Sequence, residues 1–217
     1  MKTDAFLERL SHAFEDFPRS ELPRDVRFAE ILEAVPGLAR ANNLALLNVA
    51  ASCLDAGECY VEVGTYHGSS LIAALLENDG DFLALDNWSL GDGSKEQLAK
   101  NLARFDLAGR PRLIEGDAFD MLRSGGLEGR RVGVYYYDNG HEYEQQLDGM
   151  RLIEPYLVDG ALVIVDDTDW ERVERAVGDY LVEQPRVTEI LRIDGKDRGR
   201  PEWWEGMRVL RWSKRPD

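Results

Sequence analysis

The chain has 217 residues, a length that suits one α/β domain with a full hydrophobic core. Its 26 basic and 41 acidic residues give a net charge of −15, which argues against a nucleic-acid partner, because nucleic-acid-binding proteins normally present a basic surface. The sequence contains no apolar run near the roughly 20 residues of a membrane span, no polybasic segment and no signal-peptide core, so we expect a cytoplasmic protein without a membrane partner.

Residues 1–54 are predicted to form an N-terminal helical extension. Two apolar faces recur at helical spacing, separated by prolines, and a third helix is predicted over residues 38–54. The apolar positions are Phe6, Leu7, Leu10 and Phe14 in the first face and Phe28, Ile31 and Leu32 in the second. We expect these helices to pack on a core domain formed by residues 55–217. A cap over the substrate pocket, or a contact between copies of the chain, is the alternative role.

The two cysteines, Cys53 and Cys59, do not form a metal-type cluster and are expected to be buried and reduced.

The most informative stretch is a predicted strand, residues 60–63, that runs into Gly64 and Gly68 and then into an amphipathic helix. Strand, glycine turn and helix form the first unit of a doubly wound α/β sheet, in which ligands bind at the carboxyl ends of the strands. A second predicted strand, residues 82–85, ends in Asp86, which can accept hydrogen bonds from the ribose of a nucleoside. A dinucleotide fingerprint would need glycine where Tyr66 and Ser69 stand, which disfavours a nicotinamide-dependent oxidoreductase.

The α/β alternation continues to the end of the chain. Further strands are predicted at residues 112–114, 132–137, 161–165, 187–193 and 207–212. Predicted helices run from a Ser94 cap to about Phe105, from the 138–143 loop to about Tyr156, and over residues 169–183, with Asp159-Gly160 as the turn before the fifth strand. Trp88, in the loop after the second strand, could stack on an adenine, line the substrate site or anchor the surface.

Acidic side chains follow two of the predicted strands. Asp138 ends the fourth strand, and Asp166 and Asp167 end the fifth, so all three should meet at the edge that carries the glycine turn. Clustered carboxylates repel one another, and a divalent cation removes that penalty. Oxygen ligands favour Mg²⁺, or less strongly Mn²⁺ or Ca²⁺, over zinc. The alternative is that each acid caps a helix. His141 could take a proton from a substrate hydroxyl, or it could simply cap the next helix or bond an acid.

Two segments resemble a known enzyme class. Glu62-Val-Gly-Thr-Tyr-His-Gly-Ser-Ser70 resembles the acid-x-Gly motif of class I S-adenosylmethionine-dependent methyltransferases, in the form found in the catechol O-methyltransferase branch. Asp138-Asn-Gly-His-Glu-Tyr-Glu144, followed by Gly160-Ala-Leu-Val-Ile-Val-Asp-Asp167, resembles the macrocin O-methyltransferase-like group. Asn139-Gly140 replaces the usual Gly-Asp order there, and Asp159 replaces the first glycine of the usual Gly-Gly pair.

The resemblance implies a Rossmann-like, seven-stranded, mostly parallel sheet with an antiparallel last strand, and S-adenosylmethionine and Mg²⁺ as cofactors. It implies Asp138, Asp166 and Asp167 as metal ligands and His141, with Asp138, as catalytic residues. The implied cofactor contacts form a larger set: Gly64, Tyr66, Gly68 and Ser70 at the methionine part, Asp86 at the ribose, Asp117 and Ala118 in the adenine-contacting loop, and in addition Glu62, Asn87, Trp88 and Asp138.

The function expected from these features is Mg²⁺-dependent O-methylation of a small-molecule acceptor, either the vicinal diol of a sugar or a catechol-like phenol. Residues 194–206, which include Arg198, Arg200, Trp203 and Trp204, could form a lid over the acceptor or could pack the final hairpin. Two alternatives are a metal-independent small-molecule methyltransferase and a non-catalytic module that binds a nucleoside or a protein. A homodimer formed through the N-terminal helices is a further expectation from the resemblance.

Overall fold

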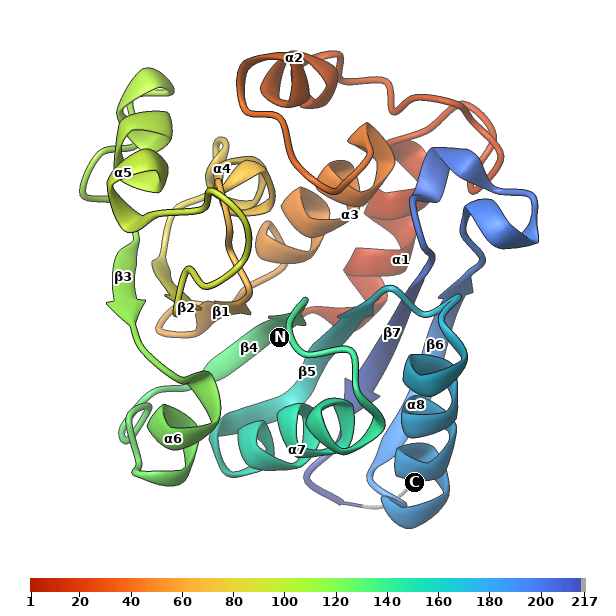
Figure 1. Cartoon of the computed structure of the whole chain (residues 1–217). Coiled ribbons are helices and arrows are strands. Elements are labelled where there is room, and N and C mark those ends of the chain that lie inside the picture. Colours follow the sequence, from red (N-terminus) through yellow and green to blue (C-terminus); the bar gives the residue numbers. More distant parts are fainter. Residues whose placement is uncertain (216–217) are drawn as a thin grey trace.

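A mixed seven-stranded sheet forms the centre of the protein in the computed structural model, which describes residues 1–215 (Figure 1). The strands are β1 (Cys59–Val63), β2 (Asp81–Asp86), β3 (Arg112–Glu115), β4 (Val132–Tyr137), β5 (Leu157–Asp166), β6 (Val187–Ile193) and β7 (Met207–Trp212). Their order is β3-β2-β1-β4-β5-β7-β6. Strands β1 to β5 pair in parallel, and β7 lies between β5 and β6 antiparallel to both. The predicted doubly wound fold with an antiparallel last strand is confirmed.

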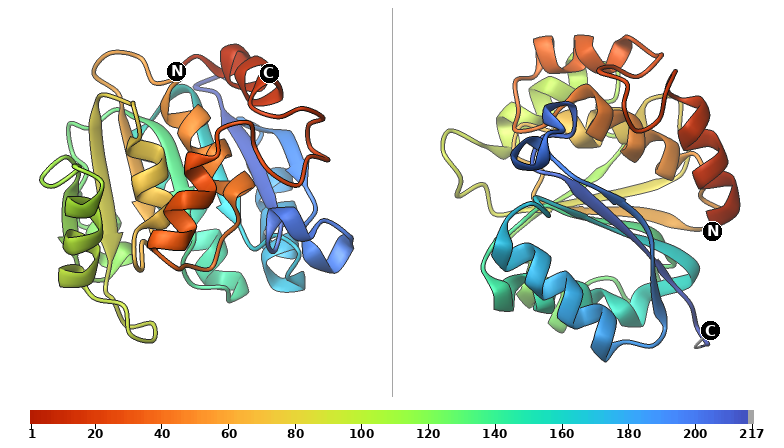
Figure 2. Two further views of the ribbon diagram at one scale, coloured as in Figure 1. Left: turned by 90° about the horizontal axis from the view of Figure 1, so that it is seen from above. Right: turned by 90° about the vertical axis from the view of Figure 1, so that its right-hand side faces the viewer.

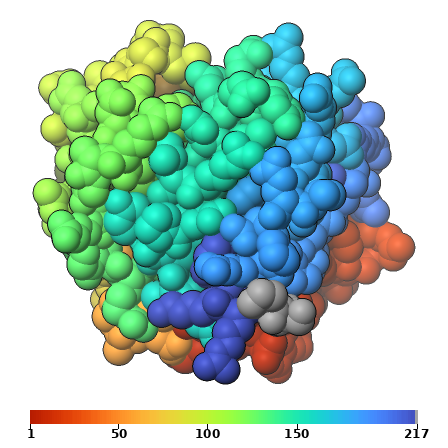
Figure 3. Space-filling view, turned by 90° about the horizontal axis from the view of Figure 1, so that it is seen from below, coloured from red at the N-terminus to blue at the C-terminus, as the bar shows by residue number. Residues whose placement is uncertain are grey.

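Helices cover both faces of the sheet (Figure 2). One face carries α1 (Thr3–His12), α2 (Arg27–Ala34), α3 (Ala41–Ala51), α4 (Ser69–Leu75) and α5 (Lys95–Arg104). The other carries α6 (Ala118–Arg123), α7 (Tyr143–Ile153) and α8 (Glu171–Glu183), and Figure 3 shows α7 and α8 side by side on it. Short 3₁₀ turns complete the elements at η1 (Glu154–Tyr156), η2 (Lys196–Arg198) and η3 (Pro201–Trp203).

The side chains of each strand point alternately to the two faces of the sheet, so the hydrophobic core consists of two clusters, one on each face. In β4, Val134 and Tyr136 pack among the N-terminal helices, whereas Tyr135 and Tyr137 pack against α7 and its neighbours. Successive side chains of a strand point to opposite faces, so a strand covered on both sides is apolar throughout. Tyr136 therefore lies on the same face of the sheet as Asp138.

The N-terminal extension is part of the larger core cluster. Phe6, Leu10 and Phe14 are fully buried in it, as the sequence pattern predicted, although Leu7 is 40% exposed. The third helix is shorter than predicted, Ala41–Ala51 instead of residues 38–54. Its start is set at Arg40, whose backbone is extended and whose amide donates to the side chain of Asn43 at 3.3 Å.

Strand β5 is longer than predicted, because Asp159-Gly160 is not a turn between elements. Gly160 has a φ of +74°, and the pairing of β5 with β4 shifts register across this point, so the dipeptide is a bulge inside the strand. The short helix α6 was not predicted, since six residues are too few to show a helical pattern. The helix predicted from residue 169 begins at Glu171.

Two further expectations can be compared with the structure. Cys53 and Cys59 are buried and form no disulfide, and burial raises the pKa of the Cys59 thiol to about 11. Across residues 1–215, the helices are all too short or too polar to cross a membrane.

Candidate active site

The glycine turn joins β1 to α4 and brings it against the tip of β4. Gly64 and Gly68 have φ values of +87° and +92°, which favour glycine. A Cβ on Gly64 would lie 1.8 Å from the carbonyl oxygen of Asp138, and one on Gly68 would lie 2.2 Å from Cδ1 of Leu98. Only glycine therefore allows this turn to lie directly against Asp138, which places the predicted cofactor site and the predicted metal site side by side.

Asp86 stands at the tip of β2 with its carboxylate held by the glycine turn. Oδ2 accepts hydrogen bonds from the amides of Thr65 and Tyr66, both at 2.7 Å, and Oδ1 accepts one from the amide of Trp88 at 2.7 Å. A carboxylate has about four lone-pair positions, so these bonds fix its orientation and leave capacity for a ligand hydroxyl. The position fits the ribose role expected of it.

Glu62 and Ser70 lie beneath the turn instead of on its open side. Glu62 is fully buried, and its carboxylate accepts hydrogen bonds from Ser70 Oγ at 2.7 Å and from the Tyr60 hydroxyl at 2.8 Å. Burial raises the pKa of Glu62 to about 7. The hydrogen bond between Glu62 and Ser70 connects β1 to α4. Direct contact of either residue with the cofactor stays a prediction.

The loop after β2 folds back on the glycine turn. Trp88 Nε1 donates to the carbonyl oxygen of Tyr66 at 3.2 Å, and the Tyr66 hydroxyl donates to Asp92 at 2.6 Å. The Tyr66 ring stacks on His67 with 3.8 Å between centroids. The Asn87 side chain closes a tight turn by accepting from the Ser89 amide. Trp88 is thus anchored to the turn itself, and stacking on adenine stays a prediction.

The predicted adenine loop lies between β3 and α6. Asp117 caps α6, because its side chain accepts a hydrogen bond from the Asp120 amide at 2.9 Å, and Ala118 is the first residue of that helix. The structure therefore gives Asp117 a structural role, and its contact with adenine is untested.

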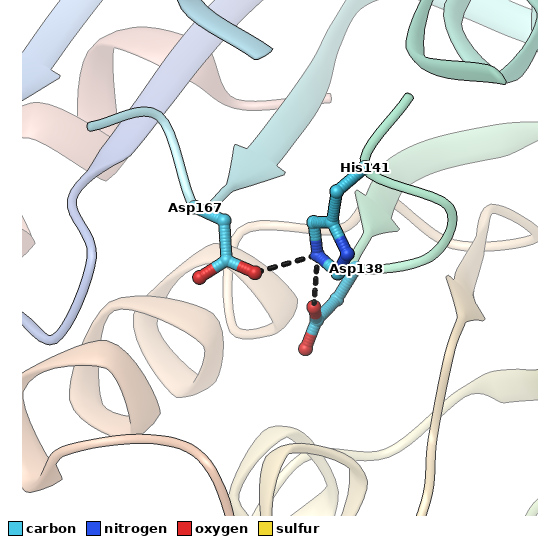
Figure 4. Close-up of side chains that lie close together, drawn as sticks. All are labelled: Asp138, His141 and Asp167. Carbon is cyan, nitrogen blue, oxygen red and sulfur yellow. Dashed lines mark ion pairs between the residues drawn. The ribbon is translucent and has the colours of Figure 1, made fainter. Parts of the chain in front are cut away.

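Three candidate ligand residues meet where the tips of β4 and β5 adjoin (Figure 4). Asp138, His141 and Asp167 each offer one ligand atom, and these atoms lie within 4.8 Å of one another. His141 Nε2 is 2.6 Å from Asp167 Oδ2 and 3.9 Å from Asp138 Oδ1. The Trp170 ring lies 4.7 Å from the His141 ring and forms a wall beside it. The imidazole therefore stands at the point that both carboxylates face.

Asp166 lies deeper than the other two acids. Its Oδ2 accepts a hydrogen bond from the Tyr136 hydroxyl, and its Oδ1 accepts one from the Asp167 amide at 2.9 Å. The Tyr136 hydroxyl is also 3.2 Å from Asp138 Oδ2. Of the three predicted metal ligands, the structure groups Asp138 and Asp167 with His141, and Asp166 with Tyr136. Sequence reasoning missed Tyr136, although its position two residues before Asp138 places both side chains on one face of the strand.

The site concentrates negative charge in a poorly solvated place. Burial, followed by the charges of Asp166 and Asp167, raises the pKa of Asp138, and burial together with Asp167 raises that of Asp166 to about 7. The adjacent Asp167 carboxylate raises the pKa of His141. Such a site attracts cations, and both the sulfonium group of S-adenosylmethionine and a divalent metal are cationic. Carboxylate oxygens such as those of Asp138 and Asp167 are ligands that suit Mg²⁺ and Mn²⁺.

Residues 194–206 border this site. The amide of Asp169 donates to the Glu205 carbonyl at 2.7 Å, which fastens the segment to the chain just beyond Asp167. Trp203 is fully buried, and its Nε1 donates to the Pro18 carbonyl at 2.8 Å, so it packs the hairpin against the N-terminal extension. Trp204 is less buried, and cations of Arg40 and Lys196 lie 4.6 and 4.8 Å from its ring. Arg198 and Arg200 are engaged by acidic side chains, mainly Glu174 and Glu202.

Comparisons with known proteins agree with the fold. Residues 61–168 match a family model described as a methyltransferase domain. The fold is similar to that of the O-methyltransferase TomG from Streptomyces achromogenes, solved with S-adenosylmethionine (18% identity, 95% of each chain covered, TM-score 0.67). It is also similar to an O-methyltransferase from Bacillus cereus solved with S-adenosylhomocysteine (14% identity, 95% of this chain and 96% of that one, TM-score 0.63). A third similar structure is CalS11, a TDP-rhamnose 3′-O-methyltransferase of calicheamicin biosynthesis (20% identity, 97% and 93% covered, TM-score 0.56). No curated protein sequence matches the chain.

The strand order, the glycine turn and the acid at the tip of β2 define a class I methyltransferase fold. Together with the match to the methyltransferase domain, they show that the chain belongs to the class I S-adenosylmethionine-dependent methyltransferases.

Proposed function

We propose that the protein is a Mg²⁺-dependent O-methyltransferase that acts on a hydroxyl of a small molecule, either a sugar diol or a catechol-like phenol. The observation that carries this proposal is the grouping of Asp138, His141 and Asp167 within 4.8 Å, directly beside the glycine turn. A methyl acceptor held at this cluster would lie next to the donor site, and holding two reactants in attack geometry supplies much of the rate in such a transfer.

Each part of the site has a role in this scheme. Asp86 would bind the ribose of the methyl donor, and the turn at Gly64 and Gly68 would lie along the donor's methionine part. Asp138 and Asp167 would hold the cation, with Asp166 either as a third ligand or as the support beneath them. A bound divalent cation supplies Lewis acidity, which makes a hydroxyl of the acceptor easier to deprotonate.

His141 would accept the acceptor's proton on its ring. Its contact with Asp167 raises its pKa, so the imidazole holds a proton more strongly than an exposed histidine would. A base must be neutral before the reaction, so we expect methyl transfer to speed up as the pH rises through this pKa. Trp170 limits the orientations of the ring and keeps water from one side of it.

A metal-independent methyltransferase is the second candidate, and the 2.6 Å contact between His141 and Asp167 favours it. An imidazole paired with a carboxylate can act as a general base without a metal. In that case Asp138 and Asp166 would be structural residues.

Calorimetric titration separates the two candidates. S-adenosylhomocysteine is titrated into the protein with Mg²⁺ and then with EDTA, and NAD serves as a control nucleotide. Mg²⁺ alone is titrated into the wild type, Asp167→Asn and the surface control Asp79→Asn, whose side chain is fully exposed. The proposal expects nucleoside binding without NAD binding, and a Mg²⁺ signal that Asp167→Asn abolishes and Asp79→Asn retains.

Turnover of a catechol and of a nucleotide sugar is then measured with and without EDTA. Turnover that stops in EDTA and returns with Mg²⁺ supports the first candidate. Nucleoside binding and EDTA-insensitive turnover without any Mg²⁺ signal would reject it in favour of the metal-independent enzyme.

A further inference from the structure

We propose that Tyr136 is a positioning residue of the metal site, and that its hydroxyl holds Asp166 in the orientation in which the tips of β4 and β5 receive a divalent cation. This inference rests on the metal-dependent function proposed above. It concerns a side chain that neither the sequence motifs nor the cluster of candidate ligands includes.

The geometry of the two strands brings this tyrosine to the acids. Tyr136 pairs with Ile164 in the parallel ladder between β4 and β5, so the residues two positions later, Asp138 and Asp166, lie level with each other at the strand tips. All of these side chains lie on one face of the sheet. The Tyr136 side chain extends toward the tips, where its hydroxyl donates to Asp166 Oδ2 and lies 3.2 Å from Asp138 Oδ2.

The environment of the hydroxyl makes this contact specific. Tyr136 is 1% exposed and packs in the same cluster as Val134 and Ile164, so its ring has no freedom to turn toward water. Asp166 is buried too, and its second oxygen is taken by the Asp167 amide at 2.9 Å. With a fixed donor on each oxygen, the Asp166 carboxylate cannot rotate, and its remaining lone pairs keep one direction.

A fixed carboxylate matters at a cation site. Groups that hydrogen-bond to metal ligands orient them, and removing such a partner typically lowers metal affinity 10- to 100-fold. If Tyr136 were phenylalanine, Asp166 would keep only the amide of Asp167 and could turn about its Cβ–Cγ bond. A neutral donor between two acids also reduces the repulsion that otherwise drives their carboxylates apart.

Tyr135 provides a matched control. It is the next residue of the same strand, it is fully buried, and it points to the opposite face among the residues that pack on α7. Its hydroxyl has no hydrogen-bond partner among residues 1–215. Tyr135→Phe therefore makes the same chemical change at the same depth without touching the acids.

The test is to measure Mn²⁺ and Mg²⁺ affinity by calorimetry for wild type, Tyr136→Phe and Tyr135→Phe, together with S-adenosylhomocysteine affinity for each. We expect Tyr136→Phe to weaken metal binding at least tenfold while nucleoside affinity changes less than twofold, and Tyr135→Phe to change neither. In an Asp166→Asn background, Tyr136→Phe should have less than a twofold further effect, because it acts through Asp166.

Three results would overturn the inference. Metal affinity of Tyr136→Phe within twofold of a metal-binding wild type rejects the positioning role and leaves the proposed function standing. A parallel loss of nucleoside and metal affinity means that the hydroxyl only supports the fold. A wild type that binds neither Mn²⁺ nor Mg²⁺ rejects the metal-dependent function and this inference together.

Discussion

Replacing Glu62 by glutamine tests the electrostatics under the glycine turn. Glu62 is fully buried, and its two hydrogen-bond donors, Ser70 and Tyr60, do not offset the loss of water around a negative charge. Its pKa is consequently raised from 4.5 to about 7. Glutamine has nearly the same shape and carries no charge. Its Oε1 can accept from one of the two hydroxyls, and its Nε2 can donate to the oxygen of the other, so the change mainly removes the cost of ionising this carboxyl.

The size and sign of the effect follow from proton linkage. Between pH 4.5 and 7 the folded protein keeps a proton on Glu62 that the unfolded chain has lost, so this residue lowers stability progressively as the pH rises through that window. A shift of about 2.5 pH units corresponds to roughly 3 kcal/mol. Relative to the wild type, we therefore expect Glu62→Gln to gain about 3 kcal/mol of unfolding free energy between pH 4.5 and pH 8, with no further gain above that.

Urea unfolding at pH 5, 6, 7 and 8 measures the difference in unfolding free energy between Glu62→Gln and the wild type. The difference between variant and wild type at each pH cancels the titration of every other group, and Glu128→Gln, at an exposed position, provides the control. A difference that stays constant over this range, or that shrinks as the pH rises, would show that the buried carboxyl titrates like an exposed one and would refute the argument.

Three further predictions concern the turn, the base and the C-terminal hairpin. Gly64→Ala should unfold the protein or destabilise it by several kcal/mol more than Gly57→Ala in urea titrations, since both glycines have positive φ but only a Cβ on Gly64 meets backbone, at 1.8 Å. In metal-free protein, NMR titration of the His141 ring should give a pKa above 6.5, and Asp167→Asn should lower it; equal values in both proteins would contradict the contact. Trp203→Ala should cost about 3–5 kcal/mol of unfolding free energy, because the side chain is fully buried, and a loss below 1 kcal/mol would contradict its role as the anchor of the hairpin.

The fold was predictable because its signals are local. Strands β4, β6 and β7 begin and end at the residues predicted from the alternation and bulk of their side chains, and Ser94 caps α5 as expected, with its hydroxyl accepting from the Gln97 amide. The position of β7 between β5 and β6 has no local signal, and only the family resemblance predicted it. The bulge at Gly160 was mistaken for a turn, because the same glycine conformation serves both.

The acids and the histidine of the candidate site were predicted from the sequence, but Tyr136 and the grouping of the acids were not. The sequence by itself predicted that Asp138, Asp166 and Asp167 would lie at the edge of the sheet that carries the glycine turn, because parallel strands end at one edge. It could not determine which acids would pair, since that depends on backbone and side-chain rotation. Asp167 has a φ of +55°, so the chain turns sharply after β5, and the two consecutive carboxylates face different neighbours. Tertiary structure alone therefore assigned Asp167 to His141 and Asp166 to Tyr136, which are contacts between strand tips far apart in the chain.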